Sequence, residues 1–250
     1  MIQLKDVNKS FKGKPALQHI NLEIRDGETL AIIGGSGSGK STLLRLMIGL
    51  IRPSGGEIWI QGRETSHLPE KEMDEVRLKM GMVFQYSALF DSMTVGDNVA
   101  FGLREHTDFP EDKIQSIVAE KLRLVGLPGI EDSMPNELSG GMKKRVSLAR
   151  AIAFEPEIIF YDEPSSGLDP IMTAKIDELI VEMQRTLKVT SVVVTHDMAS
   201  ACHIADRIAM IYEGELIAID TVRNFVKLPD PRVQAFMRSM YAEEGNADVN

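Results

Sequence analysis

Hydrophobic and polar residues alternate with a period of two in the first part of the chain. Residues 2–7 (IQLKDV) and 20–25 (INLEIR) both follow this alternation, which is typical of half-buried β-strands. Residues 29–33 (TLAII) form a short apolar run, which favours a fully buried strand, and residues 57–61 (EIWIQ) favour another strand. The opening third of the chain therefore predicts antiparallel strands beside one buried strand.

Helical periodicity dominates the middle of the chain. Apolar residues recur at spacings of three and four within 112–125, where Lys121 is a polar interruption, and residues 95–103 and 141–154 are also helix-like. Turns that contain proline separate the last two of these segments. We therefore predict a helical subdomain over residues 86–155.

Strands and helices alternate on both sides of this helical segment. Residues 81–85, 158–161 and 191–195 have the pattern of short strands, and residues 172–187 that of a helix. Strands that alternate with helices predict a mostly parallel sheet joined by right-handed crossovers. The predicted fold class is α/β, with a mostly parallel central sheet, an N-terminal antiparallel β subdomain and an inserted helical subdomain.

The predicted domain organisation follows from these elements. We expect one domain over residues 1–250, in which residues 1–85 and 156–228 form the α/β core with its β subdomain. A Glu-Gly turn between two apolar runs predicts a hairpin near the end of this core. Residues 229–250 are assigned to a C-terminal extension.

Composition and charge exclude several classes of protein. The 250 residues carry a formal net charge of −9, which argues against broad nucleic-acid binding. No run approaches the ~20 apolar residues of a membrane-spanning helix, and we expect no secretory signal. The single cysteine, Cys202, excludes an intrachain disulfide, fits a reducing compartment and is expected to be a small buried residue on a helix.

The run GGSGSGKST at 34–42 fits the phosphate-loop pattern G-x-x-x-x-G-K-[ST] and lies between an apolar strand and a helix-prone segment. Glycines let the backbone N–H groups form a concave anion site, and the following helix adds its positive end. We expect Lys40 to reach the outer phosphates of ATP and Ser41 to hold Mg²⁺. A flexible linker is the alternative, but it requires neither the Lys-Ser pair nor these flanks. The expected phosphate-binding residues are Gly34, Gly35, Ser36, Gly37, Ser38, Gly39, Lys40, Ser41 and Thr42.

Two carboxylates, Asp162 and Glu163, directly follow the apolar strand at 158–161. In a parallel sheet such a strand would deliver Asp162 to the carboxyl edge, where nucleotides bind. Phosphoryl transfer needs charge neutralisation and a positioned nucleophile, so we expect Asp162 to hold Mg²⁺ and Glu163 to polarise the attacking water. Taken alone, the two residues also fit an acidic turn at the end of a strand.

The segment LSGGM at 138–142 opens a predicted helix and provides a second potential anion site. Its N–H groups, at Ser139, Gly140 and Gly141, would combine with the positive end of the helix. An ordinary helix cap by Ser139 is the alternative. A chain with two such sites for one triphosphate suggests that a second copy of the chain supplies the second site.

In this order, the motifs resemble those of the ATP-binding subunits of ABC transporters over nearly the whole chain. The resemblance rests on GGSGSGKS at 34–41, the Q-loop residue Gln85, LSGGM at 138–142, IIFYDE at 158–163, SGLD at 166–169 and His196. It implies that two chains enclose two ATP molecules head to tail, each between one phosphate loop and the other chain's LSGGM segment. Ser139 and Gly141 would then contact the γ-phosphate across the dimer. Met142 departs from the glutamine that is usual in this family, which puts only the polar contact of that side chain in doubt.

The resemblance also implies roles for four further residues. Gln85 would sense Mg²⁺ beside the groove in which a membrane permease docks, and Asp169 would cross the dimer interface. His196 would contact the γ-phosphate and hold the water that Glu163 polarises. Phe11 would stack on adenine. Taken alone, His196 also fits a structural histidine and Phe11 a core residue.

Residues 89–107 and 228–237 resemble the ATPases of Mla-type transporters, which move phospholipid and other lipids with MCE-domain proteins. This resemblance implies a lipid cargo, an integral permease and an MCE-domain partner. It also implies a peripheral location on the cytoplasmic face of the inner membrane, with no nucleic-acid partner. An importer ATPase for a polar solute and a soluble ABC ATPase outside transport are the alternatives.

The C-terminal extension has two possible roles. In the Mla-type family it can clasp the partner ATPase, whereas the alternative for residues 231–241 is a surface helix on its own subunit. The acidic end, Glu243–Asn250, is expected to be disordered.

Overall fold

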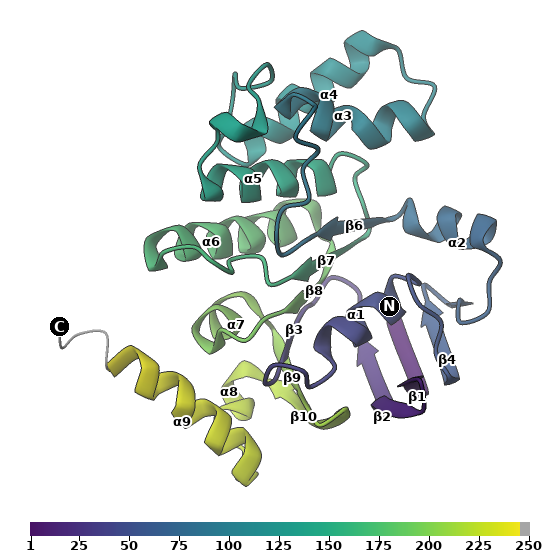
Figure 1. The fold of residues 1–250 in the computed structure, drawn as a ribbon, viewed down its shortest axis with the longest axis vertical. Coiled ribbons are helices and arrows are strands. Elements are labelled where there is room, and N and C mark those ends of the chain that lie inside the picture. Colours follow the sequence, from purple (N-terminus) through teal and green to yellow (C-terminus); the bar gives the residue numbers. More distant parts are fainter. Residues whose placement is uncertain (246–250) are drawn as a thin grey trace. The chain divides into compact units, whose positions relative to one another are not determined.

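The structure, a computed structural model, describes residues 1–245 and their side chains as far as residue 238 (Figure 1). These residues fall into two compact units. The first unit comprises Met1–Asp74 and the chain from Thr190 onward, and the second comprises Glu75–Val189. In the described part of the chain, the helices lack either the length or the apolar character that crossing a bilayer requires.

An antiparallel sheet forms one layer of the first unit (Figure 1). Its strands, in spatial order, are β2 (Lys14–Ile24), β1 (Ile2–Phe11), β4 (Gly55–Ile60) and β5 (Arg63–Glu64). Ile2 and Leu4 are buried on one face of β1, as a period of two requires, and a register shift between Leu4 and Val7 brings Val7 into the core as well. The predicted N-terminal β subdomain is therefore confirmed.

A second, mostly parallel set of strands carries the core of the first unit. Strand β3 (Thr29–Ile33) lies between β8 (Thr190–Val194) and β9 (Arg207–Tyr212) and is parallel to both. Strand β10 (Glu215–Thr221) pairs antiparallel with β9 through the predicted hairpin. All residues of β3 and β8 are buried, as continuous apolar strands of a parallel sheet should be.

Helices complete the first unit, and several were not predicted. Helix α1 (Lys40–Met47) follows the phosphate loop and ends before Gly49, whose φ of +74° is a left-handed conformation that ends helices. Short helices α7 (Met198–Ile204) and α8 (Val222–Phe225) carry too few residues for a clear period. Helix α2 (Glu70–Arg77), which spans the boundary between the two units in the sequence, was also missed. Cys202 lies on α7, as predicted, but it is half-buried rather than buried.

The C-terminal helix α9 (Pro231–Gly245) packs on its own chain. Val233 and Met237 are buried in an apolar cluster that includes Phe225 and Met198. This packing corresponds to the alternative of a helix on its own subunit. Glu243–Gly245 belong to α9, which contradicts the disorder predicted there, and residues 246–250 lie outside the described residues.

The second unit combines two parallel strands with the predicted helices (Figure 1). Strands β6 (Met80–Val83) and β7 (Ile158–Asp162) pair in parallel. Helices α3 (Val95–His106), α4 (Glu111–Leu124) and α5 (Gly140–Ala151) pack on one another, and α5 also packs on β6 and on α6 (Pro170–Leu187). A short 3₁₀ turn, Pro135–Glu137, precedes α5.

Lys121 does not interrupt the buried face of α4, because its side chain is itself only 3% exposed. Its Nζ lies 3.0 Å from a carboxylate oxygen of Glu120 and 3.2 Å from one of Glu155. The aliphatic stem of a lysine can cover apolar surface while paired carboxylates compensate the charge. The 3,4 pattern of α4 is therefore continuous in the structure.

Candidate functional site

The phosphate loop begins directly after β3 and is shaped by glycine. Gly34, with φ +150°, approaches β9 so closely that a Cβ there would lie 2.2 Å from the backbone oxygen of Ile211. Gly37 and Gly39 also adopt positive φ, and Gly39 is the N-cap of α1. Only glycine adopts these conformations at low cost, so the sequence pattern has a steric reason. The loop therefore has the backbone form that the predicted anion site at a helix N-terminus requires.

Lys40 is folded back over the loop that precedes it. Its Nζ donates hydrogen bonds to the carbonyl oxygens of Gly34 at 2.7 Å and Gly35 at 3.0 Å, and the residue is 7% exposed. The positive charge of this ammonium group lies beside the backbone N–H groups of the loop, and both attract anions. Ser41 and Thr42 follow in the first turn of α1.

His196 and the phosphate loop lie at the same sheet edge of the first unit. Strands β3 and β8 are parallel with Ile32 opposite Val194, so Gly34 and His196 each come two residues after a registered pair. The Thr195 N–H donates to the Ile32 carbonyl at 3.2 Å, which extends this alignment past the strand. His196 is exposed rather than part of the core.

Phe11 ends β1 in the other sheet of the first unit and is 47% exposed, so it is not a core residue. The Nζ of Lys9 lies 5.0 Å from the centroid of its ring. The ring is exposed enough for another ring to stack on it, but the Lys9 ammonium group also lies over this ring.

The phosphate loop borders a cavity of about 580 Å³ that the sequence did not indicate. Gly35, Ser36 and Ser38 line it on one side, and Arg232 and Phe236 of α9 on the other. The C-terminal extension and the phosphate loop therefore share a cavity within the first unit.

Gln85 and Glu163 lie at one sheet edge of the second unit. Strands β6 and β7 are parallel with Val83 opposite Tyr161, so both residues come two positions after a registered pair. Asp162 is the last residue of β7 and is half-buried, as the predicted delivery to the carboxyl edge requires. Glu163 has φ +50°, a strained backbone for a residue with a side chain.

A network of hydrogen bonds joins Gln85 to Glu163. The Gln85 side-chain amide donates to Ser166 Oγ at 3.3 Å, and the Ser166 N–H donates to the Glu163 carbonyl at 3.2 Å. Lys144 of α5, only 4% exposed, donates to the carbonyls of both Gln85 and Glu163. Lys144 was not predicted as a site residue, although two consecutive lysines follow the LSGGM segment, and Ser166 was named only as part of the SGLD motif.

Burial lowers the pKa of Lys144 below the usual value for lysine, because removal from water disfavours the charged form. The negative charges of Glu163 and Asp162 oppose this shift. The two carboxylates and this ammonium group therefore form one electrostatic cluster in the second unit.

The LSGGM segment and the start of α6 are packed together. Ser139 is the N-cap of α5 and its Oγ accepts a hydrogen bond from the Met142 N–H at 3.3 Å, so the predicted alternative of a capping role is present. This bond leaves the hydroxyl proton of Ser139 able to donate. A Cβ on Gly141 would lie 2.2 Å from the terminal methyl carbon of Met172, so a glycine there lets Met172 cover the turn.

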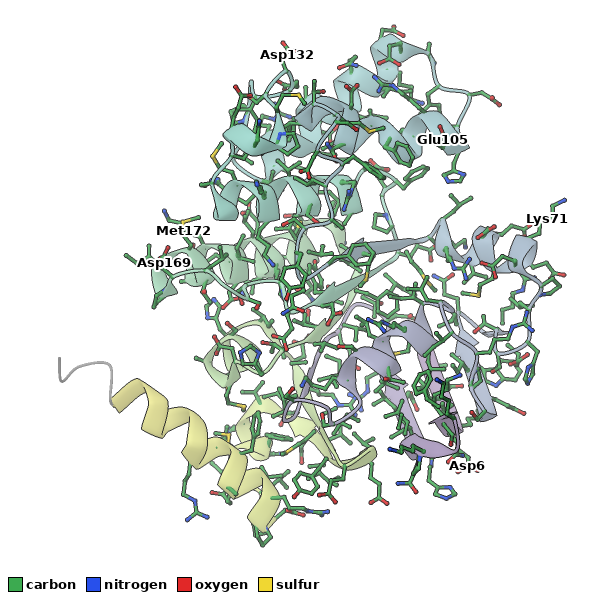
Figure 2. All side chains as sticks on the ribbon, in the orientation of Figure 1. Asp6, Lys71, Glu105, Asp132, Asp169 and Met172 are labelled. Carbon is green, nitrogen blue, oxygen red and sulfur yellow. The ribbon has the colours of Figure 1, made fainter. Side chains whose placement is uncertain are left out.

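Asp169 is the N-cap of α6, where its carboxylate accepts the Met172 N–H at 3.0 Å. Figure 2 shows Asp169 and Met172 at the same end of this helix. The predicted D-loop residue and the LSGGM turn are thus connected through Met172. Gly140, in the first turn of α5, is exposed.

The chemistry of the predicted metal ligands fits magnesium. Ser41, Gln85 and Asp162 offer a hydroxyl, an amide oxygen and a carboxylate, which are the oxygen donors that Mg²⁺ prefers. Mg²⁺ commonly uses one or two protein ligands together with substrate phosphates and water. In its own unit, Ser41 lies in the first turn of α1, Asp162 ends β7 and Gln85 follows two residues after β6.

Comparisons with known proteins identify close relatives. Residues 17–166 match the family model for ABC transporters. The intermembrane phospholipid transport system ATP-binding protein MlaF of Haemophilus influenzae is 42% identical over 95% of this chain and 90% of its own length. The methionine import ATP-binding protein MetN of Carboxydothermus hydrogenoformans is also 42% identical, over 98% of this chain and 73% of its own length.

A solved structure supports the same relationship. A dimeric ATP-binding cassette in a post-hydrolysis state, bound to ADP and Pi, matches with a TM-score of 0.82 and 35% identity. The match covers 89% of this chain and 99% of the cassette. Because the family model matches more than half of the chain and the relatives align over nearly all of it, the chain belongs to the ABC transporter family as an ATP-hydrolysing, ATP-binding subunit.

Proposed function

We propose that this chain drives the transport of phospholipid or related lipids across or between the membranes of a cell envelope. One observation carries the proposal. The phospholipid-transport relative is 42% identical over 95% of this chain. The segments 89–107 and 228–237, which resemble those of Mla-type ATPases, favour the same cargo.

Hydrolysis would proceed by positioning and charge stabilisation. The phosphate loop, from Gly34 to Thr42, binds the phosphates of ATP, and Lys40 supplies its ammonium group. Bound Mg²⁺ would neutralise phosphate charge, with Ser41, Asp162 and Gln85 as its protein ligands. Glu163 polarises the attacking water, and His196 contacts the γ-phosphate and keeps the water in place. Phe11 stacks on the adenine.

The complete site requires a second copy of the chain. Ser139, Gly140 and Gly141 would bind the γ-phosphate held by the partner copy, and Asp169 would contact the partner across the interface. The ADP-bound relative is dimeric, which supports a head-to-tail dimer here. ATP would favour the closed dimer because both copies bind its γ-phosphate, and hydrolysis would reopen it.

A membrane permease would dock on the second unit near Gln85. The loop that follows β6 exposes aromatic side chains, of which Tyr86 is 87% exposed and Phe90 is 43% exposed. Phe90 stacks against Phe101 of α3 with ring centroids 4.9 Å apart. Exposed aromatic clusters of this kind are typical of protein interfaces. The chain would then lie at the cytoplasmic face of the inner membrane, with an MCE-domain protein as a further partner.

Purification from native membranes tests this function. We expect the tagged full-length chain to retain an integral permease, an MCE-domain protein and phospholipid, all identified by mass spectrometry. A Tyr86→Ala, Phe90→Ala double variant should lose the permease, whereas Lys71→Ala, on an exposed residue of the first unit, should retain it.

Two results would contradict the proposal. Isolation with a permease and a polar-solute-binding protein, without lipid, would favour the importer, to which the methionine-import relative belongs. Isolation free of any integral membrane protein would exclude both transport functions.

A further inference from the structure

Helix α5 directs two buried or half-buried cations onto backbone carbonyls of neighbouring loops. Lys144 donates to the carbonyl oxygens of Gln85 and, at 3.5 Å, of Glu163. Arg150 donates to the carbonyls of Ser87 at 2.8 Å and Ala88 at 2.7 Å. All of these residues belong to the second unit. One helix, which starts at the LSGGM segment, therefore binds both the Q-loop and the segment that carries Glu163.

Three of the four residues whose carbonyls accept these hydrogen bonds have a strained backbone, and the fourth, Gln85, lies two residues before Ser87. Ser87, Ala88 and Glu163 have φ values of +62°, +48° and +50°, although none of them is glycine. Such conformations are costly unless the surroundings impose them. Charge-assisted hydrogen bonds from Lys144 and Arg150 are stronger than neutral ones and supply this constraint.

Lys144 differs from Arg150 because it connects two loops. Its two carbonyl partners are already linked through Ser166, which accepts from the Gln85 amide at 3.3 Å and donates to the Glu163 carbonyl at 3.2 Å. Lys144 closes this arrangement into a ring of hydrogen bonds. An ammonium group has three donors and no acceptor, so it can bind two carbonyls at once.

We propose that Lys144 is a positioning residue for ATP hydrolysis, which holds the Gln85 loop and the backbone of Glu163 to helix α5. This inference rests on the proposed role of Glu163. Any displacement of the LSGGM segment then moves Gln85 and Glu163 together, because both are attached to the same ammonium group. Lys144 acts through Glu163 and Gln85.

The first test compares three variants of the full-length chain by steady-state ATP hydrolysis. Lys144→Met keeps the length and apolar stem but removes the donors, and should lower kcat by roughly 10- to 100-fold with little change in KM. Lys144→Arg restores donors and should recover most of the lost kcat. Lys143→Met makes the same change on a half-buried neighbour and should leave kcat within about twofold of the wild type.

A double-mutant cycle distinguishes positioning from general stability. If Lys144 acts through Glu163, then Lys144→Met should produce little further loss when added to Glu163→Gln. Equal losses in both backgrounds would overturn the inference, as would a kcat for Lys144→Met close to that of the wild type. High turnover of Glu163→Gln itself would instead contradict the proposed function of Glu163, so the two failures are distinguishable.

A variant with a shorter polar side chain covers the case in which Lys144→Met does not fold. Lys144→Gln can donate from a single amide of shorter reach, so it should keep one carbonyl contact at most and show the same selective loss of kcat. Thermal unfolding of each variant separates folding from activity. A folded Lys144→Gln with normal kcat would overturn the inference.

Discussion

The two sheet edges that carry the predicted machinery are built in opposite ways. In the first unit, the loop after β3 takes its shape from glycines, and Lys40 binds the carbonyls of that same loop. In the second unit, Ser87, Ala88 and Glu163 adopt left-handed conformations without glycine, and cations from α5 bind their carbonyls. The first loop is shaped from within, and the second is held by a helix distant in sequence.

This difference determines what each sheet edge does when neighbouring elements move. A loop stabilised by its own residues keeps its shape when other elements move, which suits a site that must bind phosphates at every cycle. Loops held by another helix move with that helix, which suits a coupling element. The following substitutions test this contrast.

Glu163→Gln should have the largest effect. Loss of a general base lowers the rate of ATP hydrolysis by about 10²- to 10⁴-fold, while ATP binding remains. The variant should accumulate as closed dimers with ATP, detected by size-exclusion chromatography beside a phosphate-release assay. Glu157→Gln, on a carboxylate that pairs with Lys79 at 3.1 Å, is the matched control. Turnover close to that of the wild type would remove Glu163 from the proposed role.

Lys40→Ala should weaken nucleotide binding. Loss of a charge-assisted interaction with phosphate lowers the affinity for ATP by roughly 10- to 100-fold, measured by isothermal titration calorimetry. Lys71→Ala, on an exposed lysine of the same unit that is labelled in Figure 2, should leave the affinity unchanged. An unchanged affinity for Lys40→Ala would contradict the assignment of the phosphate loop.

Gly34→Ala and Gly35→Ala form a matched pair that tests the loop shaped from within. The new Cβ at Gly34 would lie 2.2 Å from the Ile211 backbone oxygen, whereas a Cβ at Gly35 has no neighbour within 4 Å. We expect Gly34→Ala to lower the free energy of unfolding by about 1–3 kcal/mol and Gly35→Ala to change it little. Urea unfolding measures both, and equal stability of the two variants would refute the steric explanation.

Asp97→Asn should have the smallest effect and should depend on pH. Hydrogen bonds from Arg104 and Thr94 lower the pKa of Asp97, so its carboxylate stabilises the fold above its ordinary pKa. This contribution is lost as the pH falls through the lowered pKa of the folded state. Because the side chain is 42% exposed, the expected loss at neutral pH is below about 1 kcal/mol.

Unfolding of both proteins at pH 7 and at pH 3 measures the contribution of Asp97. The difference between variant and wild type should shrink at the lower pH. A difference that grows at the lower pH would contradict this account of the Asp97 carboxylate. A large difference at pH 7 would remove the contrast between this exposed ion pair and the buried Lys144.

Most elements could be predicted because their hydrophobic period is long enough to be unambiguous. The alternation of residues 2–7 and the 3,4 spacing of residues 112–125 correspond to β1 and α4. Helix α8 was not predicted, because its four residues are shorter than two helical turns. The end of α1 depended on the left-handed backbone of Gly49, and the disorder expected at Glu243 was contradicted by α9.

The sequence alone indicated the class of fold and the candidate positions of the phosphate loop, Asp162 and Glu163, and the family resemblance added His196. These features are defined by which residue types occur and at what spacing, and both can be read directly from the sequence. Only the tertiary structure decided that Lys144, rather than Lys143, is buried and bound to Gln85 and Glu163. Its partners are backbone carbonyls, which every residue carries, so no pattern of residue types can indicate which of them a distant lysine will bind.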